Sequence, residues 1–317
     1  MQIVTSLKSN VSSRGVLSTV GMFDGVHLGH RHLLAELTRT AANKNFDSAV
    51  ITFTSHPLEV LDSSRKPRMI TSVAERLRLL EAAGVDYCFL IEFTEKLKEQ
   101  TAQSFLEKLK EEIGLKGILA GFNNNFGKRG AGDLEESAEK AGVEFFRYYP
   151  LVIDSVAVSS SAIRKLLLDC DILKANALLG RDFSLTGTVI RGKQIGRTLG
   201  FPTANIAVDC REKIIPGNGV YACRAAVEGI EPMLLPAMVN IGTNPTVGPS
   251  GEISIEAHFI GLDKDIDLYG KSVVLFFVDY IRQEIRFPSL EILAEQLKED
   301  STRCLSILSE QQNNKPI

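Results

Sequence analysis

The pattern of apolar residues in this chain changes once, near residue 183, and this change constrains the possible folds more than any other feature. Before it, short apolar runs alternate with segments in which apolar residues recur at helical spacing. The expected strands cover residues 16–20, 48–53, 85–91, 117–120 and 143–149, and the expected helices cover residues 31–44, 73–83, 101–113, 133–141, 159–168 and 171–179. Strands that alternate with helices predict an α/β domain of Rossmann-like type, with a parallel sheet covered on both faces.

After residue 183, short strand-like runs follow one another with turn residues between them. These runs cover residues 185–190, 219–227, 234–241, 253–260 and 271–281, and a last helical pattern covers residues 289–309. Such a series predicts a small antiparallel β-barrel followed by a terminal helix. A length of 317 residues suits two domains better than one. We therefore expect an α/β domain at residues 1–182 and a barrel domain at residues 183–317.

The stretch at residues 187–205, GTVIRGKQIGRTLGFPTAN, combines glycines with basic side chains. Glycine lets backbone N–H groups approach an anion, and lysine and arginine add positive charge. Thr203 and Asn205 offer neutral oxygens of the kind that Mg²⁺ accepts beside substrate phosphates. The stretch therefore predicts a nucleotide-phosphate site, although it lacks the Gly-Lys-Ser/Thr of the usual P-loop. A glycine-rich hairpin with a basic surface is the other interpretation. The candidates for ATP and phosphate binding are Gly187, Gly192, Lys193, Gly196, Arg197, Gly200, Pro202 and Thr203.

A second candidate site lies at residues 21–32, GMFDGVHLGHRH. This segment follows an expected strand and opens an expected helix, where backbone N–H groups and the helix dipole favour phosphate. His27 and His30 are three residues apart, so both imidazoles share one helix face and can donate hydrogen bonds where negative charge grows. Further candidates for phosphate binding are Gly21, Asp24 and Gly29.

Several alternatives compete for this second site. Asp24 is expected either to orient a ligand or to cap the turn. Because His32 lies close to the other two histidines, a zinc site is one alternative, although the spacing does not match His-Glu-x-x-His and no cysteine is near. A surface cluster of satisfied histidines and a general-base histidine are the others.

Two further segments carry candidate side chains. Residues 158–164, VSSSAIR, begin an expected helix, where serines cap the backbone and Arg164 can reach phosphate bidentately. An ordinary N-cap is the alternative. In the run ISIEAHF, strand alternation places Glu256 and His258 on one face and apolar residues on the other. Glu256 would there accept a proton from a substrate hydroxyl, and a solvated strand glutamate is the alternative.

These motifs resemble those of one enzyme family. The run Gly-x-x-x-Gly-Arg-x-Leu-Gly-Phe-Pro-Thr-Ala-Asn, preceded by Gly-x-Val, resembles the signature of riboflavin kinases. The run Gly-x-Phe-Asp-Gly-Val-His-x-Gly-His resembles the adenylyltransferase half of the bacterial bifunctional riboflavin kinases/FMN adenylyltransferases. Its last four residues resemble the His-x-Gly-His signature of the nucleotidyltransferase superfamily. The resemblance covers nearly the whole chain.

The resemblance implies roles for individual residues. Glu256, in a Glu-x-His segment, is the implied base of the kinase, and His27 and His30 are the implied catalytic residues of the adenylyltransferase. A segment that closes over the triphosphate in the superfamily is matched by Ser159, Ser160, Ser161 and Arg164. Flavin-binding roles are implied for Asn123, Phe126 and Arg282, with Phe287 beside Arg282 and with Asn123 also a candidate for ATP.

Two departures from the family pattern lie in the first half. In the pattern Gly-x-Asp/Asn-Phe-x-Phe-Gly, Asn124 stands where an aromatic residue is expected, whereas the matching residues are Gly121, Asn123, Phe126 and Gly127. His56-Pro57 matches the family, but Thr54-Ser55 stands where Asp-Pro usually precedes it. The residues that handle phosphate are intact.

The function implied by the resemblance has two steps. The barrel would transfer the γ-phosphate of ATP to riboflavin, giving FMN, and the α/β domain would join FMN to the AMP moiety of a second ATP, giving FAD and pyrophosphate. Mg²⁺ would accompany ATP, with Thr203 and Asn205 as its ligands. One alternative is a kinase whose adenylyltransferase is weakened or lost, which Asn124 and Thr54-Ser55 favour. The other is a non-catalytic flavin-binding regulator, which would need neither phosphate motif.

The composition argues against several other classes of protein. A net charge of −3 is unlike that of general nucleic-acid binders, which are usually basic. The five cysteines are scattered without a Cys-x-x-Cys pair, so neither a disulfide framework nor a zinc knuckle is indicated. The N-terminus lacks the layout of a signal peptide, and no apolar run approaches the roughly 20 residues of a membrane span. We expect a cytoplasmic enzyme with no nucleic-acid, membrane or obligate protein partner.

Overall fold

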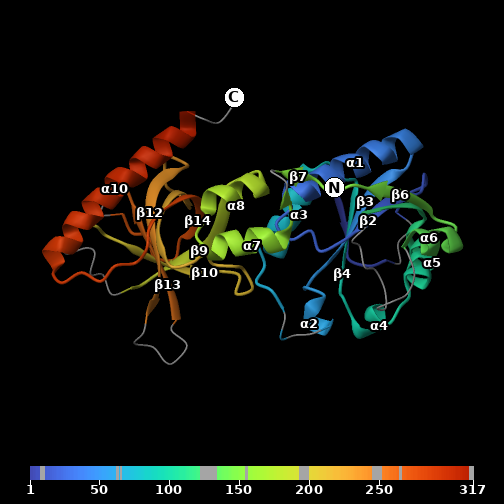
Figure 1. The fold of residues 1–317 in the computed structure, drawn as a ribbon, viewed down its shortest axis with the longest axis horizontal. Helices are drawn as coiled ribbons and strands as arrows, with labels where there is room; N and C mark the ends of the chain where they lie inside the picture. Colours follow the sequence, from blue (N-terminus) through green and yellow to red (C-terminus); the bar gives the residue numbers. More distant parts are fainter. Residues whose placement is uncertain are drawn as a thin grey trace. The chain divides into compact units, whose positions relative to one another are not determined.

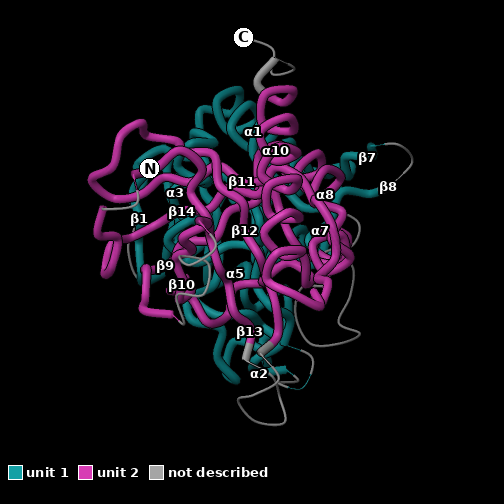
Figure 2. The backbone as a smooth tube through the Cα atoms, turned by 90° about the vertical axis from the view of Figure 1, so that its left-hand side faces the viewer, with its two compact units in different colours: residues 1–160 teal, residues 161–317 magenta. Residues whose placement is uncertain are grey.

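The computed structural model describes residues 1–7, 11–61, 64, 66–121, 134–153, 156–192, 200–244, 252–263 and 266–313. The chain divides into two compact units, Met1–Ser160 and Ser161–Ile317, which Figure 2 shows in different colours. Some residues singled out in the sequence lie outside the described residues, namely Asn123, Asn124, Phe126, Gly127, Lys193, Gly196 and Arg197. Their roles stay predictions.

The first unit is built on a six-stranded sheet in which every neighbouring pair of strands is parallel (Figure 1). Its strands lie in the order β1 (Gln2–Val4), β4 (Tyr87–Ile91), β3 (Asp47–Phe53), β2 (Val16–Val20), β5 (Leu115–Gly121) and β6 (Glu144–Tyr148). Its helices are α1 (Leu28–Lys44), α2 (Leu58–Leu61), α3 (Val73–Ala82), α4 (Glu95–Lys98), α5 (Ala102–Ile113) and α6 (Leu134–Ala141), and a small antiparallel pair joins β7 (Val152–Ile153) to β8 (Val156–Ala157). The predicted α/β architecture is confirmed.

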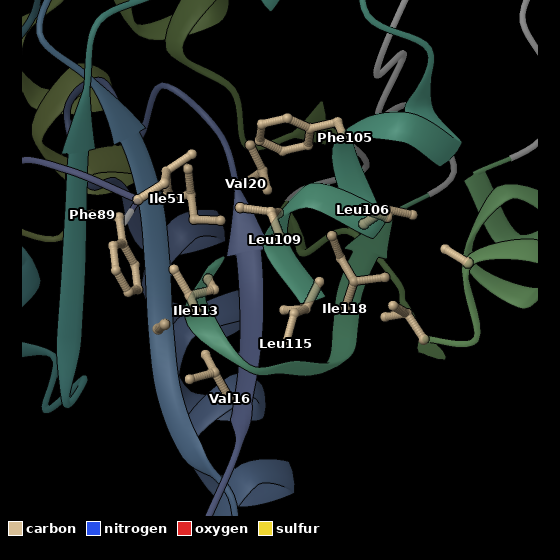
Figure 3. Close-up of a cluster of buried hydrophobic side chains, with 14 of the residues drawn as sticks. Val16, Val20, Ile51, Phe89, Phe105, Leu106, Leu109, Ile113, Leu115 and Ile118 are labelled. Carbon is tan, nitrogen blue, oxygen red and sulfur yellow. The ribbon is translucent and has the colours of Figure 1, made fainter. Parts of the chain in front are cut away.

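Alternation along β2 divides the core of this unit between the two faces of the sheet. Successive strand residues point to opposite faces, so a parallel sheet that is buried on both sides reads as a continuous apolar run. On one face, Val16 and Val20 belong to a cluster with Ile51, Phe89, Phe105, Leu106, Leu109 and Ile113 (Figure 3). Leu17 packs instead in a cluster with Leu34, Leu37 and Leu80, from α1 and α3.

The strand order places the carboxyl end of β2 at a topological switch point. From β2 the chain leads to β3 and β4 on one side, and later to β5 and β6 on the other. Open α/β sheets bind their ligands at such a point, outside the carboxyl ends of the strands. The loop from β2 to α1, which carries residues 21–27, leaves the sheet there.

The second unit contains a closed barrel in which neighbouring strands are antiparallel. Its strands lie in the order β10 (Ala204–Val208), β13 (Glu252–Phe259), β12 (Leu235–Asn244), β11 (Gly219–Val227), β14 (Ser272–Arg282) and β9 (Phe183–Ile190). Its helices are α7 (Ser160–Leu168), α8 (Ile172–Leu179) and the terminal α10 (Leu290–Asn313). The predicted barrel with a terminal helix is confirmed, and β10 is a strand that the sequence pattern did not predict.

Helix α8 packs against the barrel, although it precedes the predicted domain boundary. The Asn176 side chain donates to the Phe277 carbonyl and accepts from the Phe183 N–H, both at 2.8 Å. The compact unit accordingly begins at Ser161, whereas the functional boundary at residues 182/183 stays a prediction. Within the described ranges, no helix has the length and apolar content that crossing a membrane requires.

Candidate active sites

The loop from β2 to α1 has an unusual backbone. Phe23, Gly25 and Val26 have φ angles of 52°, 83° and 36°. Left-handed backbone is unfavourable for a residue with a side chain, and most of all for a β-branched residue such as valine. A conformation of this kind persists only where the surrounding structure holds it in place.

Asp24 supplies part of that support. Its side chain is buried, and its carboxylate accepts hydrogen bonds from the Ile70 N–H at 2.9 and 3.0 Å and from the Thr71 N–H at 3.0 Å. Its carbonyl accepts a hydrogen bond of 2.8 Å from the Ser160 hydroxyl. Asp24 therefore ties the turn to residues 70 and 71, and both roles expected for it, contact with a ligand and capping of the turn, stay predictions.

His27 and His30 form a stacked pair at the start of α1. His27 is the N-cap, and its Nδ1 accepts a hydrogen bond of 3.2 Å from the His30 N–H, which leaves the proton of the neutral ring on Nε2. The ring centroids are 3.7 Å apart and the ring planes differ by 15°. Gly29 permits this approach, because a Cβ there would lie 3.2 Å from the His27 ring and from the Val158 carbonyl.

The surroundings of His30 favour its neutral ring. Burial of the ring, and then the neighbouring His27, lower the pKa of His30 well below its usual value. Within the described part of the chain, the buried Nδ1 of His30 has no hydrogen-bond partner. Nor do the described residues contain a group of three or more His, Cys, Asp or Glu side chains placed to hold a metal, so the zinc alternative gains no support.

Two other candidates of the first site lie next to this loop within the first unit. Gly21 directly follows β2, and its N–H donates to the Ile51 carbonyl at 3.0 Å. Ser160, at the start of α7, donates to the Asp24 carbonyl and follows Ser159 in the chain, whereas Arg164, one turn into α7, belongs to the second unit. The structure thus assembles Gly21, Asp24, Ser160 and the two histidines within the first unit.

The second unit contains a cavity of about 340 Å³ between barrel strands and α10. Much of its wall is apolar, formed by Phe201, Val220, Met238, Ile285, Phe287, Leu293 and Leu297. Its polar side chains are Thr203, Asn240, Glu256, His258, Arg282 and Glu284. An apolar cavity with a few convergent polar groups is the usual form of a small-molecule site.

Strand pairing brings the end of the glycine-rich stretch against Glu256. Asn205 on β10 is the register partner of Glu256 on β13, and residues directly opposite each other share a face of the sheet. The Thr203 hydroxyl lies 3.4 Å from the Glu256 carboxylate. Gly192 makes room for Asn205, because a Cβ at Gly192 would overlap its side-chain amide. Gly187 lies within β9, opposite Val208.

His258 ties the same segment to β13. Its Nδ1 is 2.9 Å from the Pro202 carbonyl, so Nδ1 carries the proton and donates it. Its ring meets the Phe201 ring edge-on, with centroids 5.3 Å apart. Gly200, with φ of 81°, immediately precedes this segment. Glu256 and His258, two residues apart on one strand, therefore both contact residues 201–203.

Arg282 lines the cavity and forms an ion pair with α10. Its Nε lies 3.0 Å from both carboxylate oxygens of Asp300, and its Nη2 lies 2.6 Å from one of them. Its guanidinium also lies 5.6 Å from the Phe287 ring centroid. Its Nη1 donates to the Gln283 carbonyl at 2.9 Å, so the donors of Arg282 are shared between α10 and its own backbone segment, and its expected contact with flavin stays a prediction.

Sequence reasoning missed the buried polar residues that support these sites, above all Arg76 and Asp300. Both lie on helix faces that are otherwise apolar. Arg76 is four residues before the buried Leu80, and Asp300 is four residues before the buried Cys304. The signal that could have revealed both residues is a charged side chain at helical spacing from apolar residues on the same helix face.

Two family models match the chain, one described as FAD synthetase over residues 9–162 and one described as riboflavin kinase over residues 179–308. Together with the α/β unit and the barrel, these matches define the class of this protein as a transferase. The chain belongs to the family of bifunctional riboflavin kinases/FMN adenylyltransferases.

Relatives in that family are similar over most of their length. The bifunctional riboflavin kinase/FMN adenylyltransferase of Escherichia coli (strain K12) is 35% identical over 296 residues, which cover 92% of each chain. The protein of that description from Bacillus subtilis (strain 168) is 31% identical over 297 residues and also covers 92% of each chain. A crystal structure of a macrolide-efflux protein from Streptococcus pneumoniae aligns with a TM-score of 0.85 and 29% identity, and covers 95% of this chain and 97% of that one.

Proposed function

We propose that the barrel unit phosphorylates riboflavin with ATP, giving FMN and ADP, and that the α/β unit joins FMN to the AMP moiety of a second ATP, giving FAD and pyrophosphate. The observation that carries this proposal is the presence of two separately built sites in one chain. One is the stacked pair His27 and His30 at the switch point of the sheet, and the other is Glu256 beside Thr203 in the barrel cavity.

In the kinase step, the apolar wall of the cavity would hold the flavin ring and leave the ribityl chain near Glu256. The carboxylate would accept the proton of the terminal hydroxyl as that oxygen attacks the γ-phosphate. A positioned base of this kind contributes roughly 10²- to 10⁴-fold. The contact of 3.4 Å between the Thr203 hydroxyl and Glu256 supports this role, because it brings the base to the proposed phosphate-binding segment.

The residues around Glu256 fit Mg²⁺ bound together with ATP. Thr203, Asn205 and Glu256 bring hydroxyl, amide and carboxylate oxygens to one edge of the barrel. Mg²⁺ prefers such hard oxygen ligands and is commonly held by one or two of them together with substrate phosphates. When bound, it would neutralise phosphate charge. Thr203 and Asn205 would hold it, and the glycines at residues 187–200 would let the backbone approach ATP.

In the adenylyl-transfer step, His27 and His30 would donate hydrogen bonds to the phosphate that is attacked. The lowered pKa of His30 favours its neutral ring, so this ring would act by a directed N–H group. The N-terminus of α1 adds its positive dipole end at the same place. Gly21, Gly29, Ser159 and Ser160 are proposed for the triphosphate, and the assignment of Arg164 stays a prediction.

The test of this proposal is to incubate the purified protein with riboflavin, ATP and Mg²⁺ and to separate the flavins by chromatography. Successive appearance of FMN and FAD is expected. FMN without FAD would instead favour the kinase with a lost adenylyltransferase, and no conversion would favour a flavin-binding regulator. Riboflavin, FMN and ATP are the proposed partners, and the absence of nucleic-acid, membrane and protein partners stays a prediction.

A further inference from the structure

The segment that leads into α3 and the first part of that helix each contain a buried polar side chain that the proposed chemistry does not use. Thr71 is 4% exposed and Arg76 is 0% exposed, which makes Arg76 the largest fully buried side chain in the described residues. Both form hydrogen bonds with the backbone of the β2–α1 loop, Thr71 at Gly25 and Arg76 at Met22. The sequence pattern singled out neither of them.

The Thr71 hydroxyl joins two parts of the loop. It accepts a hydrogen bond of 3.0 Å from the Gly25 N–H and donates one of 3.2 Å to the Asp24 carboxylate. Gly25 has φ of 83° and lies between Phe23 and Val26, which also have positive φ. One hydroxyl therefore fixes the N–H of the residue at the centre of the strained segment.

The Arg76 guanidinium joins the ends of two neighbouring strands. One Nη donates to the Met22 carbonyl at 3.1 Å, just after β2, and the other donates to the Phe53 carbonyl, the last residue of β3. The planar fork of arginine can donate to two carbonyls at once, whereas lysine is a single point of charge. Arg76 therefore fixes the place where the loop leaves the sheet.

Burial of this guanidinium is unfavourable in itself. Desolvation lowers the pKa of Arg76, and the nearby Asp24 opposes that change. A buried ion pair can often be replaced as a whole by apolar side chains without loss of stability, whereas removal of one partner leaves the other charge buried and uncompensated. Arg76 therefore offsets the charge of the buried Asp24 as well as joining the Met22 and Phe53 carbonyls, so its effect on stability has to be measured separately from its effect on activity.

We propose that Thr71 and Arg76 are positioning residues for adenylyl transfer, which rests on the function proposed above for this unit. They hold residues 22–26, in which Phe23, Gly25 and Val26 have positive φ, and this path leads to His27 at the N-cap of α1, where its ring accepts from the His30 N–H. The two residues act through the histidines and touch no substrate.

The experiment uses two matched pairs in the full-length protein. Thr71→Ser keeps the hydroxyl, and Thr71→Val keeps the shape without it. Arg76→Lys keeps the charge without the fork, and Arg76→Met keeps most of the volume without the charge. The kcat and KM of adenylyl transfer are measured with supplied FMN and ATP, together with the thermal midpoint, and riboflavin phosphorylation by the same preparation is the internal control.

Thr71→Val is expected to lower kcat for FAD formation by roughly tenfold or more, because displacements of about 1 Å can cost 10²-fold. KM for FMN and ATP should stay within about threefold, Thr71→Ser should restore kcat, and FMN formation should be unchanged. Both Arg76 variants should lower kcat for FAD formation in the same way as Thr71→Val. Unchanged kcat in folded Thr71→Val, or equal loss in Thr71→Ser, would overturn the proposal.

A second measurement separates this inference from the proposed activity. The chain has five histidines, so their ring signals in NMR spectra can be assigned by substitution. Thr71→Val should shift the signals of His27 and His30 but not that of His258, which lies in the other unit. This readout needs no substrate, so it tests the positioning role even if wild-type protein makes no FAD. Unmoved signals of His27 and His30 would overturn the proposal.

Discussion

The two candidate sites are held in place in different ways. In the α/β unit, the site is a strained backbone loop, and its histidines depend on buried polar groups such as Asp24, Thr71 and Arg76. In the barrel, the site consists of side chains that strand register already aligns, with Glu256 opposite Asn205. The first site should therefore fail when a distant buried polar group changes, whereas the second should respond mainly to residues that line its cavity.

The sites differ in their charge as well. The neutral imidazole of His30 and the N-terminus of α1 suit the stabilisation of charge that develops on phosphate. Glu256 and Glu284 give the barrel cavity carboxylates, and a carboxylate suits the removal of a proton from a hydroxyl. The difference implies that a substitution in one site leaves the other reaction intact.

The largest expected effect concerns the independence of the barrel. A fragment of residues 161–317 should make FMN, and a fragment of residues 183–317 should be less stable by roughly 4–6 kcal/mol, because α8 buries Ile172 and Leu179 and Asn176 makes two hydrogen bonds to the barrel. Chemical denaturation of both fragments measures the difference. Equal denaturation midpoints would show that α8 does not belong to the folding unit of the barrel. A folded fragment of residues 161–317 without kinase activity would contradict the prediction that the barrel site works independently of the first unit.

The second prediction concerns His30. His30→Ala should lower FAD formation from FMN by roughly 10²- to 10³-fold, the usual effect of removing one directed donor, while FMN formation persists. His32→Ala, an exposed histidine on the same helix, is the matched control and should keep most of the activity. Equal loss of both activities in folded His30→Ala would contradict the two-site interpretation.

The strands and site residues that could be predicted from the sequence all depend on patterns within short segments of the chain. The runs at residues 16–20 and 219–227 match β2 and β11, because apolar patterning reports burial directly. The motifs around His30 and Glu256 were found because catalytic residue types stood at family spacing. Such signals need no knowledge of tertiary contacts.

The parts that it missed depend on contacts between distant segments. Strand β10 begins where the glycine-rich stretch ends and is defined by its pairing with β9 and β13. In the sequence, Arg76 resembles any other helix arginine. Its partners in the fold, the carbonyls of Met22 and Phe53, lie 54 and 23 residues away along the chain. Burial of a charge is decided by its partners, which a local pattern does not contain.

The third prediction concerns Glu256. Glu256→Gln keeps the shape and an acceptor for the Thr203 hydroxyl but removes the proton acceptor, so kcat for FMN formation should fall by roughly 10²-fold or more. ATP binding should change little, and adenylyl transfer from supplied FMN should continue. The thermal midpoint controls for folding. Near-normal turnover would mean that Glu256 is an ordinary strand glutamate.

The fourth prediction concerns His258, whose ring donates to the Pro202 carbonyl. His258→Asn places an amide N–H near the Nδ1 position and should keep kcat for FMN formation within about threefold. His258→Leu removes the donor and should lower kcat by about tenfold, near the upper net value of one hydrogen bond. Steady-state kinetics of both variants measure this. If leucine serves as well as asparagine, packing against Phe201 is the whole contribution of the ring.

The smallest expected effect is a pH dependence of stability that belongs to the first site. The pKa of His30 is lowered in the folded protein, so the unfolded chain takes up a proton near its ordinary value of about 6.5 while the folded state does not. The contribution of His30 to stability is therefore fully present above about pH 6.5 and is lost as the pH falls below that value. His30→Gln cannot titrate. Between pH 7.5 and 5.5, the thermal midpoint of the wild type should fall more than that of His30→Gln, by on the order of 1–3 °C. Only the slopes are compared, since the substitution also shifts the midpoint at every pH. Parallel slopes would mean that the ring is solvated in the folded state, and the contrast between a neutral first site and a charged barrel cavity would then lose its basis.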